Sequence, residues 1–210
     1  MTSLRTCILA AADAVDAARD ELGALDGIAG DGDHGMTMAT AARNVRAKLE
    51  AIPDVDGAAL LAPVALGVGS VGGAIGPIYA TAILKVAATR PTAPLTVAGL
   101  VACAEAAEAG IMALGKAKPG DKTVIDALHP VVESLRTSAA AGDDVATAAT
   151  AAAAAARRGA ESTADMIATI GRASRLGERS RSWADPGATS FAIIVEALAA
   201  AFVRGSSTRG

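Results

Sequence analysis

The chain has 210 residues, and 19 lysines and arginines against 22 aspartates and glutamates give a net charge of −3. This length suits one domain, and without a basic run we expect no nucleic-acid partner. Hydrophobic residues make up 52% and aromatic residues only 2%, and because alanine favours helices while sheets favour aromatic and β-branched residues, the composition predicts an all-α fold.

The first quarter of the chain predicts two helices that flank an acidic, glycine-rich loop. Apolar residues recur every three or four positions from Leu4 to Leu25, which is the pattern of one face of a long helix. A second pattern begins at about Thr37 and ends before Pro53. Residues 25–35 lie between the two patterns, so we expect them to form a loop that ends at a helix N-terminus.

Three carboxylates, Asp26, Asp31 and Asp33, lie within eight residues of this loop with no lysine or arginine among them. Ionised carboxylates held close together repel one another unless a cation lies among them. The loop therefore indicates a site for hard metal ions, although a single Ca²⁺ site without EF-hand spacing is an alternative. The free amides at the next helix N-terminus, residues 35–38, indicate a place for phosphate.

A second glycine cluster, residues 67–77, follows a helical pattern that starts at about Gly57 and precedes a helix from Ile78 to Ala88. Glycine lets backbones approach closely, so the cluster favours either a tight helix crossing or a phosphate-binding loop. No Gly-Lys-Ser/Thr follows, which excludes a P-loop.

The second half of the chain predicts helices separated by two polar stretches. A helix from Val97 to Leu114 leads to a turn at residues 116–123, and Pro130 would kink or restart the next helix. We expect the three lysines of this turn, Lys116, Lys118 and Lys122, to be solvated.

The remaining helices are an alanine-rich helix at 143–160, a short helix at 162–170 and a last helix opened by Pro186. Between the last two, residues 171–187 form a long loop with four arginines, and such loops are usually functional. We expect one domain over residues 1–204 and a frayed tail over residues 205–210.

Localisation is expected to be cytoplasmic. Cys7 and Cys103 are far apart and form no CxxC pair, which indicates free thiols in a reducing compartment. Charges interrupt the N-terminal segment, so it does not resemble a signal peptide. We expect no membrane span, since the alanine tract at 145–156 is too weakly hydrophobic to insert.

Alternate loops of an up-and-down helical bundle share one end, so the acidic loop, the glycine loop and the arginine-rich loop are expected to meet. Carboxylates for magnesium, amides for phosphate and arginine for developing charge are the groups that phosphoryl transfer requires. Two Mg²⁺ ions would offset the repulsion between three aspartates and a nucleotide that carries about three or four negative charges.

These motifs resemble the DhaL family, the nucleotide-binding L subunit of dihydroxyacetone kinases, which also occurs as the C-terminal domain of ATP-dependent dihydroxyacetone kinases. The resemblance covers nearly the whole chain, in order. The matching segments are Leu25-Asp26 with residues 30–35, residues 70–74 with 76–77, Lys116 with residues 119–123, residues 171–174 with 176–180, and residues 185–190.

The resemblance implies an antiparallel up-and-down barrel of about eight helices with a nucleotide site at one end. It implies that Asp26, Asp31 and Asp33 hold two Mg²⁺ ions, and that Arg172 is catalytic and reaches both the nucleotide and the transferred phosphoryl group. The other implied nucleotide contacts are His34, Gly35, Met36, Thr37, Ala74, Ile75, Gly115, Val124, Asp185, Pro186 and Gly187.

Several positions depart from the family pattern. Ile75 replaces a serine of the glycine loop. Val124 stands where methionine is usual, so its side chain forms a smaller wall of the nucleotide pocket. Arg175 stands where an aromatic residue is usual, and Arg181 and Trp183 alter the loop that would face a partner.

The function implied is that of a subunit that carries ADP or ATP and passes a phosphoryl group to dihydroxyacetone or a related short ketose on a separate K subunit. In one version a phosphohistidine protein of the phosphotransferase system rephosphorylates bound ADP, which a stand-alone L-type chain slightly favours. The alternatives are an ATP-dependent L component and a non-catalytic, nucleotide-binding regulator of transcription. A homodimer is left open.

Overall fold

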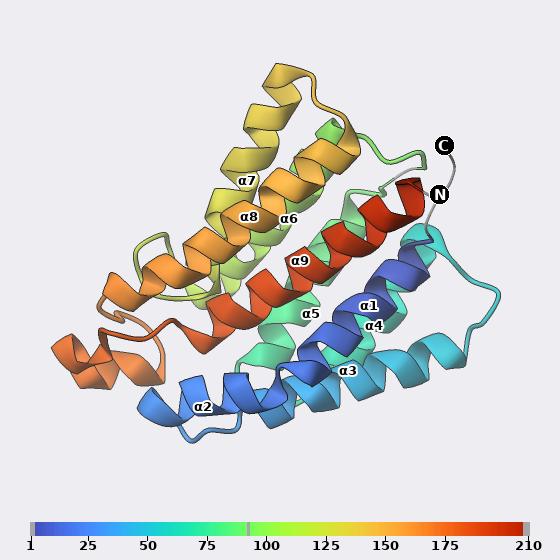
Figure 1. The fold of residues 1–210 in the computed structure, drawn as a ribbon. Helices are drawn as coiled ribbons and strands as arrows, with labels where there is room; N and C mark the ends of the chain where they lie inside the picture. Colours follow the sequence, from blue (N-terminus) through green and yellow to red (C-terminus); the bar gives the residue numbers. More distant parts are fainter. Residues whose placement is uncertain (1–2, 92, 208–210) are drawn as a thin grey trace.

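Nine α-helices and three 3₁₀ helices make up the regular structure of the described residues, 3–91 and 93–207, in a computed structural model (Figure 1). The α-helices are α1 (Leu4–Ala17), α2 (Arg19–Ala29), α3 (His34–Glu50), α4 (Leu61–Gly69), α5 (Ile75–Ala88), α6 (Val97–Gly115), α7 (Val124–Ala141), α8 (Val145–Ser162) and α9 (Pro186–Ser207). The 3₁₀ helices are η1 (Gly57–Leu60), η2 (Thr163–Asp165) and η3 (Arg172–Ser180). No strand occurs in these residues, which confirms the all-α prediction.

Eight of the helices form a closed ring. Going round it, α1, α3, α4, α5, α6, α7, α8 and α9 each pack against the next, and α9 packs back against α1. The remaining helix, α2, lies at one end of the ring against α3 and close to η3 (Figure 1). This is the predicted up-and-down barrel of about eight helices.

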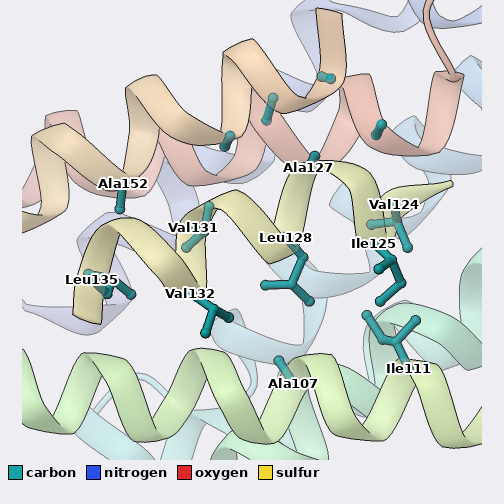
Figure 2. Packing of buried hydrophobic residues seen from close by; sticks show 14 of the residues in the cluster. Ala107, Ile111, Val124, Ile125, Ala127, Leu128, Val131, Val132, Leu135 and Ala152 are labelled. Atoms are coloured by element: carbon teal, nitrogen blue, oxygen red, sulfur yellow. The ribbon is translucent and has the colours of Figure 1, made fainter. Parts of the chain in front are cut away.

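The largest part of the core lies between α6, α7, α8 and α9 (Figure 2). Branched side chains of α7 fill it, among them Ile125 and Val132, while α8 contributes mainly alanines such as Ala148 and Ala156, which are fully buried. Small side chains let helix axes approach closely, so the alanine tract of α8 is a packing surface rather than a low-complexity linker. At Gly159 even a methyl group would meet the backbone of α7.

The acidic loop is shorter than predicted, because helices extend into it from both sides. The first helical pattern divides at Ala18, and α2 then turns to lie on α3, where Gly35 allows backbone contact with Arg19 and Gly23. Asp26 consequently lies within α2, and α3 begins at His34 rather than at Thr37. Only residues 30–33 connect the two helices.

The predicted short helix at 162–170 is wrong beyond Asp165. Residues 166–170 are irregular because their polar groups bind other segments: the amide of Ala168 donates to Ser180 Oγ, and Thr169 binds Asp121. The following loop contains η3, which the sequence pattern did not predict. Pro130 neither ends nor restarts α7, which continues through it to Ala141.

Two helices, Val97–Gly115 and Pro186–Gly205, are long and apolar enough to cross a membrane by length and composition alone. The sequence analysis expected no membrane span and did not single out these two helices. Each packs between two neighbours in the ring, α6 between α5 and α7 and α9 between α8 and α1. Helix α9 continues to Ser207, and residues 208–210 of the predicted tail lie outside the described residues.

The close approach of α7 and α8 at Gly159 can be tested by substitution. Gly159→Ala adds a methyl group against the backbone oxygen of Asp126 and 2.9 Å from the Cα of Ala127, so we expect the free energy of unfolding to fall by about 1–3 kcal/mol. Urea denaturation measures this. Gly115→Ala is the matched control, because a Cβ there meets nothing within 4 Å; equal effects of the two substitutions would contradict the close crossing.

Candidate functional site

The loops that follow α2, α6 and α8 and the start of α5 are joined by side-chain contacts at one end of the barrel. Arg172 of η3 pairs with Asp31 of the acidic loop. Ser190 of α9 binds both His34 of α3 and Tyr79 of α5. Lys122 of the 116–123 turn binds the backbone of the α8–α9 connection. The predicted meeting of the acidic loop with the arginine-rich loop is therefore present, and α5, which follows the glycine loop, is joined to the same end through Tyr79.

The three predicted metal ligands come together. Asp26 projects from the last turn of α2, Asp31 lies in the connecting loop, and Asp33 precedes α3, with one oxygen of each carboxylate within 4.8 Å of the others. Asp26 Oδ2 accepts a hydrogen bond from the backbone amide of His34 at 3.2 Å, which fixes it to the start of α3. A side chain at Gly30 would collide with the Asp26 carboxylate, so glycine there lets the loop close round it.

The charges of the cluster are unevenly balanced. The Arg172 guanidinium holds the pKa of Asp31 below its usual value, whereas burial and the neighbouring charge of Asp31 raise the pKa of Asp33. A divalent cation would relieve this repulsion better than one exposed arginine. Three carboxylate oxygens within reach of one ion are also the donors that Mg²⁺ prefers, so these residues fit magnesium.

The N-terminus of α3 lies directly beside the cluster. The N-cap residue Asp33 makes no side-chain hydrogen bond to the first turn, and among the described residues the one first-turn amide bound by a side chain is that of His34, which donates to Asp26. Uncapped amides and the positive end of the helix dipole favour an anion. Of the predicted contacts, Gly35 is buried against α2, Met36 is exposed and Thr37 is half-buried, so Met36 has the most accessible side chain.

His34 belongs to the interior rather than to the exposed surface of the site. Its Nε2 lies 3.0 Å from Ser190 Oγ, which is 3.0 Å from the hydroxyl of Tyr79. The Tyr79 hydroxyl also donates to the carbonyl of Gly187 at 3.4 Å. Burial lowers the pKa of His34, which favours the neutral ring. This hydrogen-bond network fixes the starts of α3, α5 and α9 relative to one another.

The other predicted contacts differ in exposure. Ala74 is exposed at the start of α5, whereas Ile75 packs against the cluster that contains Tyr79. Gly115 is exposed at the end of α6, whereas Val124 is buried in the main core. Ile75, which stands where the resemblance implies a serine, therefore makes an apolar contact.

Asp185, Pro186 and Gly187 form the entry to α9. Asp185 Oδ1 accepts a hydrogen bond from the amide of Ala188 at 2.7 Å, and its own amide donates to Thr163 Oγ1 at 2.8 Å. Burial raises the pKa of the Asp185 carboxyl to about 6, although the Ala188 amide and Lys122 oppose the rise. Pro186 and Gly187 are half-buried in the first turn of α9.

Sequence reasoning missed several buried polar groups behind the site. Lys122 is only 3% exposed, so the expectation of a solvated lysine is wrong there, while Lys116 and Lys118 are exposed as expected. Tyr79 and Ser190 lie within the predicted helices that begin at Ile78 and Pro186. Nothing in helical periodicity marks such residues, because their partners lie far away in the sequence.

Comparison with known proteins identifies the family of this chain. The family described as the DAK2 domain matches residues 28–200. The chain is 40% identical over 179 residues to the "PEP-dependent dihydroxyacetone kinase, ADP-binding subunit DhaL" of Escherichia coli strain K12, with 84% of this chain and 85% of that protein covered. It therefore belongs to the DhaL family of kinase subunits.

Longer kinases contain a similar segment. The D-erythrulose kinase of Mycolicibacterium smegmatis is 35% identical over 198 residues, which cover 90% of this chain and 33% of that protein. The crystal structure of the dihydroxyacetone kinase of C. freundii in complex with AMP-PNP and Mg²⁺ matches with a TM-score of 0.68 and 26% identity, over 92% of this chain and 33% of that one. The chain thus spans about a third of each of these two proteins.

The raised pKa of Asp185 predicts a pH effect. The folded protein holds a proton on this carboxyl up to about pH 6, whereas the unfolded chain loses it near pH 4, so this contribution to stability is present at low pH and is lost as the pH rises through 6. Asp185→Asn removes the titration. Its free energy of unfolding, relative to the unmodified protein, should rise by about 1–3 kcal/mol between pH 4 and pH 7. A constant difference in urea denaturation across this range would contradict the assignment.

Proposed function

We propose that this chain is the nucleotide-binding subunit of a cytoplasmic two-component ketose kinase. It carries ADP or ATP with two Mg²⁺ ions and passes the terminal phosphoryl group to dihydroxyacetone, or a related short ketose, on a separate K subunit. The observation that carries the proposal is the cluster of Asp26, Asp31 and Asp33, whose oxygens lie within 4.8 Å of one another beside Arg172.

The roles of the residues follow from their chemistry. The three aspartates would hold the magnesium ions, which when bound supply positive charge to the phosphates. The amides at the start of α3 orient phosphate oxygens, and the guanidinium of Arg172, already beside the cluster, stabilises charge on the transferred group. No residue has to act as a nucleophile, since the acceptor hydroxyl belongs to the ketose.

The names of the relatives support the version in which bound ADP is rephosphorylated in place. One is the "PTS-dependent dihydroxyacetone kinase, ADP-binding subunit DhaL" of Lactococcus lactis, 36% identical over 182 residues.

A subunit that retains ADP should release about one equivalent of ADP on heat denaturation, whereas one that exchanges ATP for ADP should release little. Turnover with a K subunit, supplied with either ATP or a phosphohistidine protein, then identifies the donor.

Asp31→Asn should weaken magnesium and nucleotide binding together, because the amide cannot supply the negative charge that one ion requires. Calorimetry with ADP should show affinity reduced about tenfold or more in the presence of Mg²⁺ and little changed without it. The control is Asp54→Asn, an exposed aspartate in the α3–α4 connection. Unchanged affinity of the Asp31 variant in Mg²⁺ would contradict the metal site.

Arg172→Ala should leave nucleotide binding nearly intact but slow phosphoryl transfer about 100-fold, because arginine acts on charge that develops in the transition state. Steady-state turnover with the K subunit, alongside calorimetry, separates the two effects. Arg179→Ala removes the same charge from the same 3₁₀ helix and is the control. A wild-type rate for the Arg172 variant would refute its assigned role.

A further inference from the structure

The segment between α8 and α9, residues 163–185, carries Arg172 and is tied together at its base. The amide of Asp185 donates to Thr163 Oγ1, and the amide of Ser182 donates to the carbonyl of Ala164, both at 2.8 Å. Further along, Ser180 Oγ accepts from the amide of Ala168 at 2.9 Å. The segment therefore closes on itself before it reaches the acidic cluster.

Lys122, from a different loop, joins the two ends of this segment. Its Nζ donates to the carbonyl of Thr163 and to the carbonyl of Trp183, each at 2.7 Å. The same nitrogen lies 5.5 Å from the centre of the Trp183 ring, within the range of a cation–π contact. With two carbonyls and a ring as neighbours and 3% exposure, this ammonium is not free to bind a phosphate.

The residue next to it makes a second attachment. Asp121 Oδ1 accepts from Thr169 Oγ1 at 2.5 Å, and the Asp121 carbonyl accepts from the amide of Thr169 at 3.3 Å. Lys122 itself has φ of 61°, in the left-handed region that favours glycine. A lysine in that conformation costs backbone energy, which its buried hydrogen bonds offset.

We propose that Lys122 is a positioning residue for phosphoryl transfer. By joining Thr163 to Trp183 it keeps the 163–185 segment closed, so that Arg172 at its tip lies beside Asp31. The attachment is a property of the fold alone, whereas its effect on transfer rests on the function proposed above. The two parts can therefore fail separately.

The attachment is tested by proteolysis and fluorescence of Lys122→Met, which keeps an unbranched side chain without the charge. Trypsin cleavage after Arg172, Arg175, Arg179 and Arg181, followed by mass spectrometry, should be at least about tenfold faster, because a charge-assisted buried hydrogen bond is worth that factor in a local opening equilibrium. The emission of Trp183, the one tryptophan of the chain, should shift. Lys118→Met, an exposed lysine of the same turn, should change neither.

The effect on transfer is tested by kinetics with a K subunit. Lys122→Met should lower kcat about tenfold while the KM for nucleotide stays within about threefold, and the Lys122→Met, Arg172→Ala double variant should be no slower than Arg172→Ala alone. A purely structural role would instead lower the rate of the double variant further. The conservative variant Lys122→Arg keeps a charged donor and should restore part of kcat, and no restoration would count against the positioning role.

Each outcome points to one conclusion. Unchanged cleavage of the Lys122 variant overturns the attachment, and faster cleavage with additive kinetics overturns the positioning role. A wild-type rate for Arg172→Ala overturns the proposed function but leaves the attachment standing. If Lys122→Met does not fold, Thr169→Val, which removes only the hydroxyl that donates to Asp121, should accelerate the same cleavages by a smaller factor.

Discussion

The mutual repulsion of three carboxylates is the constraint on which this end of the barrel depends. Asp26, Asp31 and Asp33 are held together by a helix on each side of a four-residue connection, and the only cation paired with them in the described residues is Arg172. Bringing like charges together costs energy unless the surrounding backbone is rigid or a counter-ion is present. The barrel supplies the rigidity, and the arginine supplies part of the counter-charge.

Two kinds of packing make the barrel rigid. Around α7 and α8 the barrel is held mainly by alanines and branched side chains. At the site end, buried polar residues replace them: His34, Ser190 and Tyr79 in one network, and Asp121 and Lys122 in another. Hydrogen bonds are directional, so they fix loops in one geometry where apolar contacts would leave several.

The sequence was sufficient for the fold class and for the cluster of three aspartates, because both depend on local patterns. Alanine content and helical periodicity predict the helices, and three aspartates so close in the chain have to lie near one another in space. The division at Ala18 and the irregular backbone at 166–170 could not be predicted, since they depend on contacts with Gly35 and with Asp121, which are distant in the chain. The burial of Lys122 has the same origin. Its partners become visible only after the loops have been placed.

The path of the ring also sets where the helix ends lie. Helix α9 begins at the site beside His34 and ends next to the start of α1, where the thiol of Cys7, whose pKa is raised mainly by burial, is influenced by the charge of Arg204 (Figure 1). At 1.5 Å per residue, α9 carries the chain about 30 Å away from the acidic cluster. A domain fused before α1 or after α9 would therefore be anchored at the end of the barrel that lies away from the acidic cluster. Its linker would have to span the length of the barrel to reach the acidic cluster.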